Sequence, residues 1–142
     1  MSKSMREKLD NLRQRKNKDY QNIVYYSYKM SIYEHINNHE LKRLEHSIRS
    51  LREFNNEICV YLFCDDHNFI SSDFCSNYDV NFRSFVDGFD HDMLSAWSIH
   101  RWYNLKYFEG RSCNILYLDS DTIFYDDPQY LFNTYCHRDV YG

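Results

Sequence analysis

One stretch of the chain, Asn114-Ile115-Leu116-Tyr117-Leu118-Asp119-Ser120-Asp121-Thr122, is an apolar run that ends abruptly in two carboxylates separated by one small residue. Such a run is typical of a buried β-strand. Residues two apart in a strand point the same way, so Asp119 and Asp121 aim together only if the backbone stays extended. A turn would swing Asp121 aside and let the pair flank a ligand. Carboxylates this close repel each other, and a hard divalent cation would relieve the repulsion, because it prefers oxygen ligands.

Upstream of this run, apolar strands alternate with amphipathic helices. Strands are predicted over residues 22–28, 57–64 and 80–85, helices over 34–54 and 93–108, and a short polar, partly helical segment over 67–77. Such alternation gives a mostly parallel α/β sheet with helices on its faces. The usual doubly wound, Rossmann-like order places the first strand beside the fourth, with the second and third on the far side, and ligands bind where the winding reverses. Residues 26–28 would then lie opposite residues 119–121.

Arg101 is the polar member of an apolar helical stripe. Leu94, Trp97, Leu105 and Phe108 recur with it at spacings of three and four. A buried guanidinium needs a partner, and carboxylates or a ligand phosphate at the strand ends would supply one. The alternative is that Arg101 reaches solvent and only packs its stem.

Composition restricts the class of protein. The chain has 142 residues, enough for one domain, and its 43% hydrophobic and 18% aromatic content can form a core. A net charge of -4 does not favour a nucleic-acid surface, and with 3 Gly the chain has no glycine-rich phosphate loop. No apolar run is long enough for a transmembrane segment. Five cysteines without a Cys-x-x-Cys pair indicate reduced thiols and a cytoplasmic location.

Two segments lie outside the strand–helix pattern. Residues 1–19 are polar and basic, with Met5, Leu9 and Leu12 at helical spacing. They form either a solvated, partly disordered leader or a short amphipathic helix with weak membrane contact. Asp126-Asp127-Pro128 predicts a helix start, with Asp as the cap and Pro at the first helical position.

The region around the two carboxylates resembles a known family. Residues 116–123 (LYLDSDTI), followed by residues 127–132 (DPQYLF), are similar to the DxD region of GT-A-type glycosyltransferases, most of all to the glycogenin-like branch. Residues 101–105 resemble the helix before that strand, and residues 46–51 and 139–142 also fit the family. The resemblance extends over about residues 20–142, which implies that this segment is the nucleotide-sugar-binding half of a GT-A domain.

The resemblance implies a hexosyltransferase type of glycosyltransferase. Its donor would be a nucleotide-diphospho-sugar, expected to be a UDP-sugar, held through Mn²⁺ or Mg²⁺, and its acceptor a glycan, lipid or protein that the sequence does not identify. The implied metal ligands are Asp119 and Asp121. The implied donor contacts are Tyr26, Ser27 and Tyr28 for the base, Asp65 for the uracil imide, Ser120 for the nucleoside and Arg101 for the phosphate or sugar.

The chain departs from the family in two places. The helix at residues 93–108 carries Ser95 and Ser98 where the glycogenin-like branch often has a lysine. The acceptor-binding half and a late metal-binding histidine would follow Gly142. We therefore expect either the amino-terminal, donor-binding half of a longer enzyme or a degraded remnant, inactive or nearly inactive alone.

Three alternatives stay open. A phosphatase or phosphotransferase of the haloacid dehalogenase class also ends a strand in D-x-D, with the first Asp as nucleophile, but few residues follow here. A sugar-nucleotide-binding module without catalysis is the second. The third is simple turn and capping chemistry by Asp119 and Asp121.

Overall fold

A computed structural model describes residues 21–28, 37–86 and 99–135. Four predicted segments lie outside the described residues: the leader (1–19), the starts of two predicted helices (34–36 and 93–98) and the family-like segment 139–142. Described strands are β1 (Gln21–Tyr28), β2 (Cys59–Cys64), β3 (Val80–Arg83) and β4 (Cys113–Tyr117). Described helices are α2 (Asn37–Phe54), α3 (Ser72–Tyr78), α4 (Ile99–Asn104), the 3₁₀ helix η2 (Leu105–Phe108) and α5 (Gln129–Tyr135).

The four described strands form one parallel sheet in the order β3-β2-β1-β4. This is the doubly wound order predicted from the sequence. β1 lies in the interior, with Tyr25 paired to Tyr61 on β2 and to Tyr117 on β4. The winding therefore reverses between β1 and β4, and the carboxyl ends of these strands meet at one edge of the sheet.

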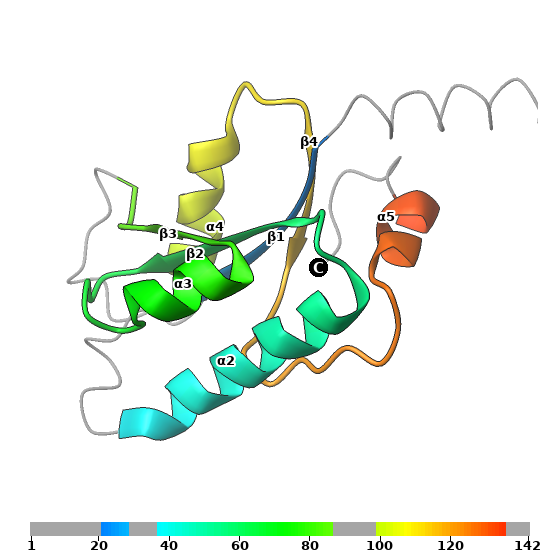
Figure 1. The fold of residues 1–142 in the computed structure, drawn as a ribbon. Helices are drawn as coiled ribbons and strands as arrows, with labels where there is room; N and C mark the ends of the chain where they lie inside the picture. The colour runs from blue at the N-terminus through cyan, green and yellow to red at the C-terminus, as the bar shows by residue number, and fades with distance from the viewer. Residues whose placement is uncertain (1–20, 29–36, 87–98, 136–142) are drawn as a thin grey trace, which may run out of the picture.

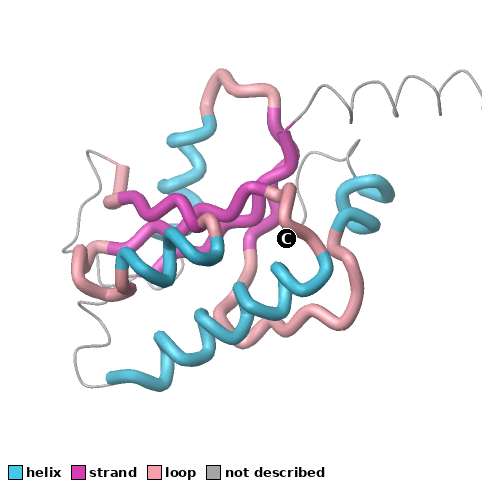
Figure 2. Tube along the Cα trace, viewed as in Figure 1, coloured by secondary structure: helices cyan, strands magenta, loops and turns pink. Residues whose placement is uncertain are grey.

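Helices cover both faces of the sheet, as Figures 1 and 2 show, with α2 and α3 on one side and α4 on the other. Alternate residues of a strand point to opposite faces, so each strand contributes to two cores. Val24, Tyr26 and Tyr28 pack toward α2, whereas Ile23 and Tyr25 pack toward η2. Because both faces are buried, the strands are almost continuously apolar in sequence.

Three details of the predicted elements differ in the structure. The second strand begins at Cys59 instead of Glu57. The third strand ends at Arg83 instead of Phe85, and Val86 donates its backbone N–H to the side chain of Asn104 at 3.0 Å. The third helix tightens into a 3₁₀ turn after Asn104. In a 3₁₀ helix residues i and i+3 lie on one side, which brings Leu105 and Phe108 together in the core below α4.

The start of α5 confirms the predicted cap. Asp127 Oδ1 accepts a hydrogen bond from the backbone N–H of Gln129 at 2.9 Å, and buried Pro128 lies between them. A side-chain oxygen at this position satisfies one of the amide groups that a helix start leaves unpaired.

Candidate functional site

The two carboxylates follow β4, at the edge of the sheet where β1 and β4 end. The backbone N–H of Leu118 donates to the carbonyl of Tyr25 at 3.0 Å, so β4 stays beside β1 up to this residue. The chain then turns, because the N–H of Thr122 donates to the carbonyl of Asp119 at 3.1 Å. Asp119 and Asp121 are both exposed. Of the two backbone geometries that the sequence allowed, the structure has the turn.

Helix α2 holds this turn from one side. Ser120 Oγ donates to Glu40 Oε2 at 3.1 Å, and Glu40 belongs to the first turn of α2. Further along, the backbone N–H of Phe124 donates to Ser50 Oγ at 2.9 Å. The segment after β4 is therefore fastened to α2 at two points, and Figure 1 shows it running along that helix toward α5.

The end of β1 contributes three residues with different environments. Tyr26 is completely buried, and its hydroxyl lies 2.6 Å from Ser47 Oγ of α2. The structure therefore places Tyr26 in the core and removes it from the candidate base contacts. Ser27 is also buried, and its Oγ accepts a hydrogen bond from Asn104 Nδ2 at 3.0 Å.

Tyr28 is the β1 residue best suited to bind a ligand. Its side chain is 7% exposed, and its hydroxyl has no hydrogen-bond partner of good geometry within the described ranges. Burial raises the pKa of Tyr28 well above its usual value; Ser120 lies close enough to lower it, and Glu40 raises it. Ser120 Oγ donates its own proton to Glu40, and the Tyr28 hydroxyl has no hydrogen-bond partner among the described residues. A buried unpaired hydroxyl is costly, and a polar ligand atom would satisfy it.

On the opposite face, Arg101 lies beside the fourth strand. Its carbonyl accepts a hydrogen bond from the Tyr25 hydroxyl at 2.8 Å, and its guanidinium carbon is 5.0 Å from the centre of the Tyr117 ring. The predicted placement on the sheet-facing side of the helix is thereby confirmed. Its Nε is buried without a partner in the described part of the chain.

Tyr117 lies near both Arg101 and the first carboxylate. Burial raises the pKa of Tyr117, the nearby guanidinium of Arg101 lowers it, and the negative charge of Asp119 raises it. Both charged groups are therefore close to Tyr117. A cation that could contact a ligand phosphate and a carboxylate that could bind a metal lie on the same side of the strand end.

Asp65 follows β2 and lies at the same edge of the sheet, because Cys64 is paired with Tyr28. It is half-buried and makes contacts of its own. Its position agrees with a contact to a ligand at the end of β1, which stays a prediction.

The described residues alone do not supply a complete set of metal ligands. No group of three or more His, Cys, Asp or Glu side chains comes together among residues 21–28, 37–86 and 99–135. Asp119 and Asp121 would supply carboxylate oxygens, which suit Mg²⁺ and Mn²⁺. A cation bound there would need the rest of its oxygen ligands from water and from a ligand such as a diphosphate.

Two residues at this edge were not identified from the sequence. Glu40 contacts Ser120 across 80 positions of the chain, and no local pattern indicates that contact. Asn104 is 0% exposed and joins β1 to the segment after β3 through its two side-chain hydrogen bonds. Its one signal is the spacing of three from Arg101, which places a second polar residue near the apolar stripe.

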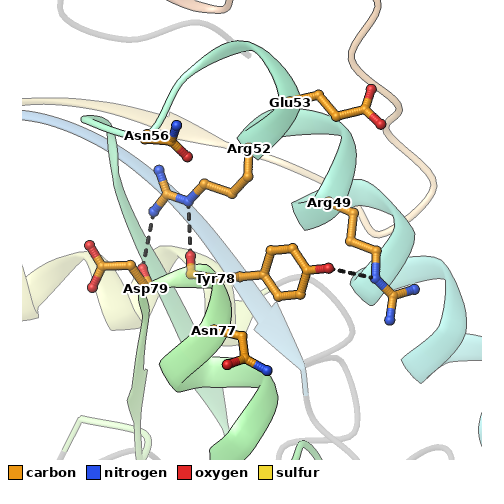
Figure 3. Close-up of a pocket in the computed structure, with 7 residues that line it drawn as sticks. All are labelled: Arg49, Arg52, Glu53, Asn56, Asn77, Tyr78 and Asp79. Carbon is orange, nitrogen blue, oxygen red and sulfur yellow. Dashed lines mark hydrogen bonds between the residues drawn. The ribbon is translucent and has the colours of Figure 1, made fainter.

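A cavity of about 390 Å³ lies away from these residues, at the amino ends of β2 and β3. Figure 3 shows its lining, contributed by the ends of α2 and α3: Arg49, Arg52, Glu53, Asn56, Asn77, Tyr78 and Asp79. Arg52 donates to backbone carbonyls there, including those of Tyr78 at 2.9 Å and Asp79 at 3.0 Å. This guanidinium is used to hold the fold together and is poorly placed to bind a ligand.

Comparison with known proteins gives no match to a family model, to a curated protein or to a solved structure. Among the described helices, none combines the length and the apolar character needed to cross a bilayer.

Proposed function

We propose that this chain binds a nucleotide-diphospho-sugar, expected to be a UDP-sugar, through a divalent cation held by Asp119 and Asp121, as the donor-binding part of a glycosyltransferase. The observation that carries the proposal is the position of the two exposed carboxylates in a turn after β4, where the winding of a parallel sheet reverses. Ligands of open α/β sheets bind at this point.

The surrounding side chains support a polar, phosphate-containing ligand. Arg101 Nε and the Tyr28 hydroxyl are the two buried side-chain polar atoms without a partner in the described ranges. Both belong to the elements that border the turn, since Tyr28 ends β1 and Arg101 contacts Tyr117 of β4. A guanidinium suits phosphate oxygens, and a tyrosine hydroxyl suits a base or a sugar hydroxyl.

Each residue has a separate part in the proposed mechanism. Bound Mn²⁺ or Mg²⁺ would act as a Lewis acid that stabilises the negative charge of the leaving diphosphate. Asp119 and Asp121 would bind the cation, and Arg101 would add positive charge beside the diphosphate. Glu40 holds the turn in place through Ser120. The acceptor and the stereochemistry of transfer are not part of the proposal.

Calorimetry of UDP binding with and without Mn²⁺ tests the proposal. We expect metal-dependent binding to the wild-type chain and a loss of roughly tenfold or more in affinity for Asp121→Ala and Asp119→Ala, in line with the effect of perturbing metal sites. Asp126→Ala is the matched control, because this exposed carboxylate lies in the same segment but outside the turn.

Two results would count against the proposal. UDP binding that is absent under both conditions would remove a sugar-nucleotide role altogether. Turnover of a generic phosphoester that depends on Asp119 would instead favour the phosphatase alternative. Metal-dependent UDP binding without sugar transfer would identify a binding module and would leave the assignment of the site intact.

A further inference from the structure

Two arginines converge on one tyrosine at a place that the proposed donor site does not use. Arg83 ends β3, Tyr107 belongs to η2, and Arg111 lies in the loop before β4. Arg83 Nε donates to the Tyr107 hydroxyl at 3.1 Å. The guanidinium carbon of Arg111 is 4.7 Å from the centre of the Tyr107 ring.

Tyr61 of β2 completes this group, which we call the Arg83–Arg111 cluster (Tyr61, Arg83, Tyr107 and Arg111). The rings of Tyr61 and Tyr107 are 5.6 Å apart between centres, and the guanidinium carbon of Arg83 is 5.7 Å from the centre of the Tyr61 ring. The hydrogen bond from Arg83 and, after it, the neighbouring Arg111 lower the pKa of Tyr107. The cluster thus joins two cations and two phenol groups from four segments of the chain.

Within the described residues, no carboxylate balances the positive charge of the cluster. Neither Arg83 nor Arg111 forms an ion pair with a carboxylate in the parts of the chain that the structure describes. The two guanidinium groups repel each other. An anion bound between them would attract both and so offset that repulsion. Arg111 is exposed and Arg83 is half-buried, so an anion can reach them from solvent.

We propose that the Arg83–Arg111 cluster binds a phosphate-type oxyanion. Guanidinium groups present planar pairs of N–H donors that match phosphate oxygens. Of the five N–H donors of Arg83, Nε is used by Tyr107 and one N–H of Nη1 by the carbonyl of Phe82 at 2.8 Å, which leaves the second N–H of Nη1 and both of Nη2 for the anion. The tyrosine rings hold the guanidiniums in place by cation–π contact, and their hydroxyls add further polar groups.

Arg49 shows what a purely structural arginine looks like in this protein. It also donates to a tyrosine hydroxyl, that of Tyr78 at 3.3 Å, and lies 5.8 Å from the centre of the same ring. It is paired with a carboxylate, Glu45, at 3.4 Å, whereas the cluster arginines have no such partner among the described residues. Arg49 is therefore a matched control, with the same residue type and aromatic contact but a balanced charge.

Calorimetric titration of the whole chain with inorganic phosphate at low ionic strength tests the inference. We expect saturable binding that weakens by roughly tenfold or more in Arg83→Gln and in Arg111→Gln, since each removes a charge-assisted contact. Arg49→Gln should stay within about twofold of the wild type, because its charge is already paired. Arg111 is exposed, so its substitution is expected to leave the fold intact.

A further variant separates this site from the proposed donor site. Asp121→Asn should leave phosphate binding at the cluster unchanged, whatever it does to metal-dependent UDP binding. The inference is overturned if phosphate shows no saturable binding, if Arg49→Gln weakens binding as much as Arg111→Gln, or if added sodium chloride at the same ionic strength produces the same heats as phosphate.

Discussion

Replacement of Arg52 by alanine should destabilise the protein more than replacement of any exposed arginine. Arg52 is 8% exposed and donates to four backbone carbonyls, two near the end of α2 and two at the end of α3. The distances are 2.9 Å to Tyr78, 3.2 Å to Asn55, 2.7 Å to Ile58 and 3.0 Å to Asp79. One side chain thus holds the two segments that lead into β2 and β3.

The size of this destabilisation follows from the four hydrogen bonds that the backbone carbonyls lose in Arg52→Ala. A hydrogen bond from a charged donor contributes about 1.5–3 kcal/mol, so four such bonds set an upper limit that is not reached, because contributions of one side chain are not additive. Water from the adjacent cavity can also bind some of the freed carbonyls. We therefore expect Arg52→Ala to lower the free energy of unfolding by about 3 kcal/mol.

Urea denaturation followed by circular dichroism measures this effect. Arg49→Ala is the control and should lower the free energy of unfolding by less than about 1 kcal/mol, because its pairing with Glu45 is exposed to solvent. Arg52→Lys should lie between the two variants, since an ammonium cannot reproduce the planar fork of donors. Equal free energies of unfolding for Arg52→Ala and Arg49→Ala would show that the four contacts from Arg52 to backbone carbonyls do not stabilise the fold.

Three further predictions concern the fold around the candidate site. Asn104→Leu keeps the branched shape of the side chain but removes its hydrogen bonds to Ser27 Oγ and to the backbone N–H of Val86. We expect a loss of about 2–4 kcal/mol in the free energy of unfolding by urea denaturation, and a loss below about 0.5 kcal/mol would contradict this expectation. Asp127→Ala removes the cap of α5 and should cost about 1 kcal/mol by the same measurement, whereas Asp127→Asn should keep most of that stability. Burial raises the pKa of Tyr26 from 10.0 to about 12. The Tyr26 hydroxyl ionises at lower pH in the unfolded chain than in the folded protein. Its contribution to folding stability is therefore complete below a pH of about 10 and is lost as the pH rises toward 12. The melting temperature of Tyr26→Phe should therefore fall less steeply between pH 10 and pH 12 than that of the wild type. Equal dependence of the melting temperature on pH in the two proteins would refute the raised pKa of Tyr26.

The sheet was predictable because its signals are local. Apolar runs bounded by polar segments indicate strands, and their alternation with amphipathic helices restricts the topology. The positions of Asp119 and Asp121 followed directly, since they come after the last such run. The turn that they form is closed by one backbone hydrogen bond. The sequence allowed either this turn or an extended backbone.

The details of the site depend on contacts between distant residues. The sequence alternation placed Tyr26 and Tyr28 on one face, but their different hydroxyl environments depend on Ser47 of α2 and on the Ser120–Glu40 pair. The 3₁₀ turn after Asn104 likewise depends on how η2 packs beneath the sheet. Tertiary packing of this kind overrides local propensity.

The attachment of the β4 turn to α2 has a consequence for ligand affinity. A flexible loop must lose conformational freedom when it closes on a ligand, and that loss of entropy weakens binding. Here the bonds from Ser120 to Glu40 and from Phe124 to Ser50 restrict the segment that carries both carboxylates before any ligand arrives. Sequence changes on α2 that never touch a ligand could therefore alter affinity through the loop's freedom alone.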